Sequence, residues 1–238
     1  MARHTHPAIL LVAHGSRSPL AQAALAQLAA QVQQQWPQNA PEPWLATACL
    51  ELAPQPLHEQ IRAIATRAQQ AGRSHLTILP LFLQPGVHAC EDIPAEIAIA
   101  QPLAPLPLKL LPYLGSHSAF RACVADRFGN TPGTARLLLA HGSRRPGSDR
   151  PLATLAAQLA ARFACWSVPP SLATQVAAGD QQGERALTIQ PYFLFPGRLT
   201  ADIAAEVARL QTQYPDIHLQ LQPPLATGNE LAGRSPRS

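Results

Sequence analysis

The chain has 238 residues, of which 47% are hydrophobic, 5% aromatic and 13% charged. This length suits one large domain or two small ones, and the composition excludes wholesale disorder. Basic residues exceed acidic ones by only 18 to 14, and Lys109 is the sole lysine, so the dispersed arginines argue against a nucleic-acid surface. No apolar run reaches membrane-spanning length, and the first residues show no signal-peptide pattern, so we expect a cytoplasmic protein without membrane partners.

The first half alternates predicted strands and helices. Ala8–Ala13 is a continuous apolar run, typical of a strand that is buried on both faces. A helix is predicted to begin at Ser18 and Pro19 and to end before Pro37. The order predicts an α/β fold with a four-stranded parallel sheet and helices on both sides. The remaining predicted elements are a strand over Trp44–Leu52, a helix over Pro56–Gln70, a strand over His75–Phe82, a helix over Asp92–Ala100 and a strand over Leu106–Leu111.

The second half repeats motifs of the first half in the same order. AILLVAHGSR at residues 8–17 corresponds to ARLLLAHGSR at residues 135–144. LPLFLQPG at residues 79–86 corresponds to QPYFLFPG at residues 190–197, and an Asp-Ile pair follows each. These matches predict two tandem homologous domains, residues 1–130 and 131–238, joined by the Gly-rich and Pro-containing segment 129–134.

Three residues able to do chemistry lie where the predicted strands of the first half end. His14 follows the first strand, Glu51 closes the second, and His88 lies in the loop after the third. In parallel sheets, ligands bind beyond the carboxyl ends of the strands. Two imidazoles and a carboxylate can bind a divalent metal ion and can transfer protons. The sequence therefore predicts one such site in the first half.

The second half is predicted to be degenerate. It keeps His141 but has no histidine opposite His88. Leu172–Ala178 is predicted to be its second strand, and the strand Ala186–Phe193 follows so soon that the helix between them is expected to be missing. On this interpretation the counterpart of Glu51 falls near residues 177–179, where there is no carboxylate.

Other candidate residues are weaker. Ser16 and Ser143 precede helices without a Gly-x-Ser-x-Gly motif, so we expect capping groups rather than nucleophiles. His117 lies in a Gly-Ser-His-Ser loop after the fourth strand. No two cysteines show Cys-x-x-Cys spacing, which argues against a zinc ribbon, a thioredoxin-like motif and a ferredoxin-type cluster. The histidines expected to be ordinary surface or core residues are His4, His6, His58, His75 and His218.

The segments LLVAHGSR, ACLELAPQPL and ILPLFLQPGVHACEDIPAEI closely resemble the sirohydrochlorin chelatases, the class II chelatases of sirohaem and cobalamin synthesis. The resemblance covers nearly the whole chain and is to the long form, in which two fused halves replace a homodimer. It therefore implies two chelatase-like domains and a monomer with pseudo-twofold halves. It also implies that His14, His88 and Glu51 bind the metal ion and accept pyrrole protons during insertion into sirohydrochlorin. No nucleotide and no permanent cofactor are implied, since the divalent metal ion (Fe²⁺ or Co²⁺) is a substrate.

Arginines in the strand-end loops are predicted to bind this substrate. The planar guanidinium group suits carboxylates, which it can bind through two hydrogen bonds, and sirohydrochlorin carries many carboxylates. The candidates are Arg17, Arg144, Arg145 and Arg198.

Three alternatives stay open. Iron is favoured over cobalt because residues 229–238 contain neither the histidine-rich tail nor the Cys-x-x-Cys found in some cobalt-inserting relatives. A cobalt-inserting enzyme is the first alternative, and a non-catalytic carrier of tetrapyrrole or metal is the second. A histidine phosphatase is the third, and it is disfavoured because Ala13, rather than an arginine, precedes His14.

Overall fold

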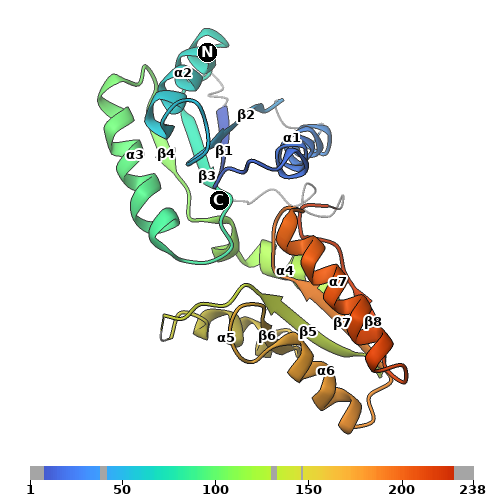
Figure 1. Ribbon diagram of the computed structural model, residues 1–238. Helices are drawn as coiled ribbons and strands as arrows, with labels where there is room; N and C mark the ends of the chain where they lie inside the picture. The colour runs from blue at the N-terminus through green and yellow to red at the C-terminus, as the bar shows by residue number, and fades with distance from the viewer. Residues whose placement is uncertain (1–7, 38–41, 130–132, 146, 228–238) are drawn as a thin grey trace. The chain divides into compact units, whose positions relative to one another are not determined.

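The computed structural model describes residues 8–37, 42–129, 133–145 and 147–227. The chain divides into two compact units between Arg121 and Ala122, inside the helix α4 (Ser118–Arg127). Each unit has its own sheet (Figure 1). Residues 130–132 of the expected linker lie outside the described residues, so a domain boundary at residue 130 stays a prediction.

The first unit contains a four-stranded parallel sheet with the strand order β2-β1-β3-β4. The apolar strand β1 (Ala8–Ala13) is central and pairs with β2 on one side and β3 on the other. This arrangement confirms the fold class predicted from the alternating elements. The other strands are β2 (Trp44–Cys49), β3 (Leu76–Pro80) and β4 (Leu108–Leu110).

Helices cover both faces of this sheet, with α1 on one face and α2 and α3 on the other (Figure 1). Leu10 and Val12 of β1 are fully buried and belong to the same apolar core as Ile61 of α2 and Ile93 of α3. Because alternate side chains of a strand point to opposite faces, a wholly apolar strand fits a sheet covered on both sides. The helical segments are α1 (Pro19–Gln34), α2 (Leu57–Gln70), a single π turn η1 (His88–Asp92), α3 (Ile93–Ala100) and the short 3₁₀ turns η2 (Gln101–Leu103) and η3 (Leu114–Ser116).

The second unit repeats the architecture of the first. Its sheet is parallel, with the strand order β6-β5-β7-β8, and its central strand β5 carries the repeated apolar run. The strands are β5 (Ala135–Ala140), β6 (Arg162–Cys165), β7 (Ala186–Pro191) and β8 (His218–Leu221). The helices are α5 (Arg150–Gln158), α6 (Leu172–Gln181) and α7 (Arg198–Gln213).

One prediction for the second unit is wrong. Residues 172–178 form the start of α6 rather than a strand, so the helix expected to be missing is present. Ser171 caps this helix through a hydrogen bond from the backbone N–H of Thr174 to its hydroxyl. Leu172 and Val176 are four residues apart and both are buried, which is helical spacing. The second strand is instead the short β6, which precedes a Ser-Pro-rich loop.

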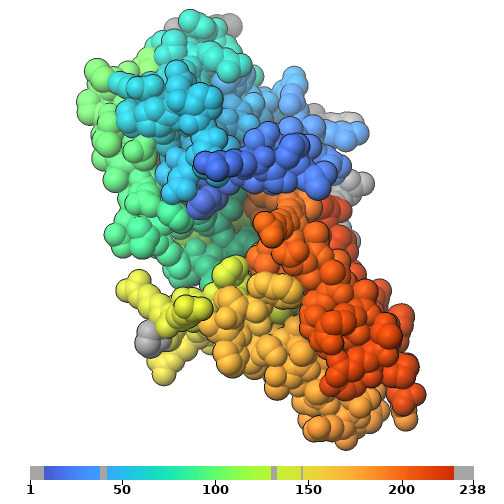
Figure 2. Space-filling view, viewed as in Figure 1, coloured from blue at the N-terminus to red at the C-terminus, as the bar shows by residue number. Residues whose placement is uncertain are grey.

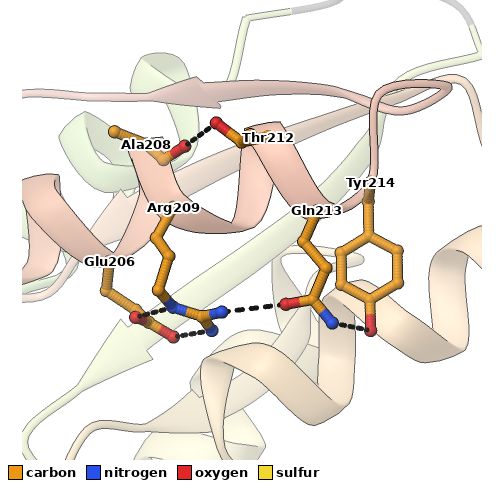
Figure 3. A network of polar contacts seen from close by, with 6 residues as sticks. All are labelled: Glu206, Ala208, Arg209, Thr212, Gln213 and Tyr214. Carbon is orange, nitrogen blue, oxygen red and sulfur yellow. Dashed lines mark hydrogen bonds and ion pairs between the residues drawn. The ribbon is translucent and has the colours of Figure 1, made fainter.

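Helix α7 lies on the surface of the second unit, where its residues are coloured orange to red (Figure 2). Figure 3 shows Arg209 donating two hydrogen bonds to the Glu206 carboxylate, at 2.7 and 2.8 Å, and a third to Gln213 Oε1 at 2.9 Å. The hydrogen bond from Arg209 lowers the pKa of Glu206 below its usual range. Exposed pairs of this kind add little stability, so the buried residues Ile203, Val207 and Leu210 fix the helix in place.

Candidate metal-binding site

The candidate site lies at the carboxyl edge of the first unit's sheet. His14 comes directly after β1, and Glu51 comes two residues after the end of β2. His88 opens the π turn η1, which follows β3. Since β1 lies between β2 and β3 and all three are parallel, their ends bring these three segments to one edge.

The backbone holds His14 and Glu51 together. Pairing between β1 and β2 continues past the strands, with the Glu51 N–H donating to the His14 carbonyl at 2.8 Å. Gly15 has a φ of +106°, and a Cβ atom there would collide with the Glu51 carbonyl. Glycine alone adopts this positive φ without strain and also has no Cβ atom to collide with the Glu51 carbonyl. The glycine after His14 therefore allows the loops that follow β1 and β2 to approach closely.

The side chains of His14, Glu51 and His88 converge. One potential ligand atom from each lies within 4.8 Å of the others. His14 Nε2 is 3.8 Å from Glu51 Oε2, and the two imidazole centroids are 4.8 Å apart with their planes at 82°. The side chains of His14 and Glu51 are about half exposed, so the group is open to solvent. The structure thus brings together the three residues predicted from the sequence.

This donor set suits a divalent transition-metal ion. Imidazole and carboxylate are ligands that such ions share, and three protein ligands leave coordination positions free for another molecule. A closed set of four ligands would hold the ion permanently. The geometry is therefore suited to an ion that must be exchanged.

Two neighbouring residues were not predicted from the sequence. The Phe82 ring centroid lies 6.3 Å from that of His14 and 6.2 Å from that of His88, so it adjoins both imidazoles. Asp92 Oδ2 lies 2.7 Å from His88 Nδ1. The available signals were the position of Phe82 at the end of the third predicted strand and the spacing of four residues between His88 and Asp92.

The corresponding edge of the second unit differs. The backbone N–H of Ser167 donates to the His141 carbonyl, as that of Glu51 does to His14, so Ser167 is the counterpart of Glu51. This corrects the predicted position near residues 177–179, which followed from taking α6 for a strand. The Ser167 hydroxyl lies 3.3 Å from His141 Nδ1. Within the described ranges, the first-unit triad is the one group found that could hold a metal ion.

The four candidate arginines all lie on exposed loops or a helix start. Arg17 follows β1 in the first unit, whereas Arg144 and Arg145 follow β5 in the second. Arg198 is the first residue of α7. None of these guanidinium groups forms an ion pair with a carboxylate in the part of the chain that the structure describes. Their binding role stays a prediction.

The loop serines shape the backbone. The Ser16 hydroxyl accepts a hydrogen bond from the Ser18 N–H at 3.0 Å, and the Ser143 hydroxyl accepts one from the Arg145 N–H at 3.1 Å. The same turn thus recurs in both units, but the expected capping role is wrong, because Ser18 and Asp149 are the N-cap residues of α1 and α5. Ser18 begins α1 as predicted, but its side chain forms no capping hydrogen bond.

The remaining described histidines form other contacts or lie on the surface. His58 Nδ1 is 2.9 Å from Glu96 Oε2, and His75 Nδ1 is 3.0 Å from the Ser74 hydroxyl. His117 Nε2 lies 3.0 Å from the Pro112 carbonyl, and His117 is not a member of the group formed by His14, Glu51 and His88. His218 is exposed on β8, and His4 and His6 lie outside the described residues. The four cysteines, which all lie in the described residues, form no disulfide bond there.

Comparison with known families gives one match over both halves. The CbiX family model matches residues 8–131 and 135–233. No curated protein matches the chain. None of the helices in the described residues is long and apolar enough to cross a membrane.

Solved structures of similar fold cover almost the whole chain. SirB from Bacillus subtilis with Fe³⁺ has a TM-score of 0.74 and 23% identity, over 96% of this chain and 93% of that one. The sirohydrochlorin chelatase SirB from Bacillus subtilis subspecies spizizenii, in complex with cobalt, has a TM-score of 0.70 and 23% identity, over 96% and 92%. CbiX, described as the terminal enzyme for biosynthesis of siroheme in denitrifying bacteria, has a TM-score of 0.59 and 24% identity, over 94% of each chain. At these identities the likeness shows the fold.

Proposed function

Because the chain belongs to the CbiX family, as its resemblance to the sirohydrochlorin chelatases predicted, we propose that it inserts a divalent metal ion into sirohydrochlorin. The reaction needs no nucleotide and serves sirohaem or cobalamin synthesis. The observation that carries the proposal is the convergence of His14, Glu51 and His88 at one open edge of the sheet. The cytoplasmic location and the monomeric state expected from the sequence stay predictions.

The proposed chemistry follows from the donor set. Insertion replaces two pyrrole N–H protons by one metal ion. The neutral imidazoles of His14 and His88 hold the ion before transfer, and as the ion passes to the macrocycle each imidazole accepts one of the two pyrrole protons. The Glu51 carboxylate, 3.8 Å from His14 Nε2, offsets part of the charge of the ion.

Iron is the metal that we favour, and cobalt is the alternative. The affinity of imidazole and carboxylate ligands for divalent ions rises from Mn²⁺ through Fe²⁺, Co²⁺ and Ni²⁺ to Cu²⁺. This ligand set alone therefore does not make the site specific for iron. The similar structures include one that contains Fe³⁺, one that contains cobalt, and one whose protein is assigned to siroheme synthesis. Insertion rates with Fe²⁺, Co²⁺ and Ni²⁺, measured side by side, should be highest for Fe²⁺; a higher rate with Co²⁺ would replace this assignment.

The insertion reaction is tested by mixing the purified protein with sirohydrochlorin and Fe²⁺ without oxygen and following the visible spectrum. We expect His14→Ala and His88→Ala each to lower the rate by at least about 100-fold, since each removes a metal ligand and a proton acceptor. Circular dichroism should show an unchanged fold, because the side chains are partly exposed. A protein that binds sirohydrochlorin but never turns it over would be the carrier instead.

The arginine prediction concerns substrate binding. Arg145→Ala or Arg198→Ala should raise the KM for sirohydrochlorin several-fold while changing kcat little, because the lost contacts are with the carboxylate rim and not with the reacting nitrogens. Arg209→Ala is the matched control, because this exposed arginine of α7 already pairs with Glu206. An unchanged KM in both variants would contradict the role assigned to these residues.

A further inference from the structure

The segment that carries His88 is one residue longer than its counterpart in the second unit. Pro85 to Ile93 spans nine residues, and the matching stretch from Pro196 to Ile203 spans eight. Ile93 and Ile203 are both fully buried in the cores of their units. The extra residue must therefore be absorbed between fixed ends.

The π turn η1 absorbs this residue. The N–H of Ile93 bonds to the carbonyl of His88, five residues earlier, before α3 continues with ordinary helical geometry. In the second unit α7 begins directly as an α-helix at Arg198. Single π turns inside helices arise from such one-residue insertions and occur often at functional sites.

The two ends of the turn face each other. His88 is its first residue and Asp92 its last, and His88 Nδ1 lies 2.7 Å from Asp92 Oδ2. A carboxylate only accepts hydrogen bonds, so Nδ1 must carry a proton and donate it. In the neutral ring, Nε2 then keeps its lone pair free for a ligand.

The second unit keeps the carboxylate without the histidine. Asp202 is the counterpart of Asp92 in the repeated Asp-Ile pair. It is exposed and, among the residues that the structure describes, has no ion-pair partner. The fold therefore accepts an aspartate at this position even where no histidine pairs with it. The contact of Asp92 with His88 in the first unit is accordingly a feature of the candidate site.

We propose that Asp92 is a positioning residue for His88. It fixes the imidazole in the Nδ1–H tautomer, holds the ring toward His14 and Glu51, and strengthens Nε2 as a donor to the metal ion. Carboxylate partners of this kind set the orientation of metal-binding histidines. This role depends on the proposed function in one respect: the metal ion that His88 binds is the ion to be inserted into sirohydrochlorin.

The test measures Co²⁺ binding by the protein alone, without sirohydrochlorin, by calorimetry. Asp92→Ala should weaken Co²⁺ affinity by about 10–100-fold. Asp92→Asn should lose less, because the amide oxygen still accepts the Nδ1–H hydrogen bond. Asp202→Ala, the matched control, should bind Co²⁺ as the unchanged protein does.

A second measurement separates positioning from general damage to the fold. The ¹⁵N shifts of the His88 ring in the metal-free protein should report the Nδ1–H tautomer, and Asp92→Ala should shift it to a mixture. Unchanged Co²⁺ affinity in Asp92→Ala, where His88→Ala loses binding, would overturn the proposal. If Asp92→Ala weakens Co²⁺ binding but the protein never inserts metal, the positioning role stands and the chelatase function fails.

Discussion

Two cysteines occupy matching positions in the two sheets but have different surroundings. Cys49 ends β2 beside Ala13, and Cys165 ends β6 beside Ala140. Burial raises the pKa of both thiols. Burial raises the pKa of Cys165 most, and the like charge of the Asp149 carboxylate, 4.0 Å from its sulfur, raises it further, to about 11.

This difference predicts a loss of stability at alkaline pH. Between the ordinary thiol pKa of 9.0 and the folded value of about 11, the unfolded chain releases the Cys165 proton and the folded chain keeps it. The unfolded state then binds fewer protons, so the free energy of unfolding falls as pH rises through this window. Urea unfolding across the window should show a shallower decline for Cys165→Ala than for the unchanged protein. An equal change in Cys90→Ala, whose thiol is exposed, would argue against this origin.

The convergence of His14, Glu51 and His88 could be predicted because each residue follows an apolar run, and a recognisable motif adjoins each histidine. His14 precedes Gly-Ser, and His88 follows Pro-Gly. Asp92 and Phe82 were not predicted, because their proximity to the two imidazoles is a three-dimensional distance that a sequence motif does not give. The partner of Asp92 also depends on a π turn, whose geometry is set by the buried Ile93 after it.

At the scale of elements, three helices end in the same backbone motif. After α2, the N–H of Arg73 bonds to the Ala68 carbonyl and that of Gly72 to the Gln69 carbonyl. The residue between helix and loop takes a positive φ in each case, which favours glycine. It is Gly72 after α2 and Gly183 after α6, but Ala160 after α5, with a φ of +50°.

Ala160→Gly should therefore stabilise the protein. Relief of the left-handed conformation is worth roughly 1 kcal/mol in the free energy of unfolding, and Ala160 is exposed, so little packing is lost. Gly72→Ala is the reciprocal variant and should destabilise by a similar amount, since open space surrounds Gly72 and only the backbone is strained. Chemical denaturation of both variants measures the pair. Changes of the same sign would contradict the explanation.

The element that sequence reasoning misread was α6. Its apolar residues, read as a run over 172–178, resemble a buried strand, and the strand that precedes it, β6, has only four residues. The strand order and the repeat were predictable because they follow from long apolar runs and repeated motifs. A four-residue strand beside a Ser-Pro loop carries too few residues for its period to show.

At the scale of the whole molecule, the two units share one strand order but, among the residues that the structure describes, only the first has a group of three possible metal ligands. The proposed enzyme therefore has one working site. His141→Ala should retain most of the insertion rate, whereas His14→Ala should abolish it, although the two residues occupy the same place in their sheets. Steady-state rates with sirohydrochlorin measure the comparison. Equal losses in the two variants would show that both sites take part.

The extra residue in the π turn also bears on how such a chain can change over generations. Pro85 and the buried Ile93, which flank the turn in the first unit, have the counterparts Pro196 and the buried Ile203 in the second unit. Loss of the His88 codon would convert the longer form to the shorter one and would leave both of these residues in place. A duplicated gene could thus silence the second histidine in one copy by the smallest in-frame deletion and leave a partner half that still folds.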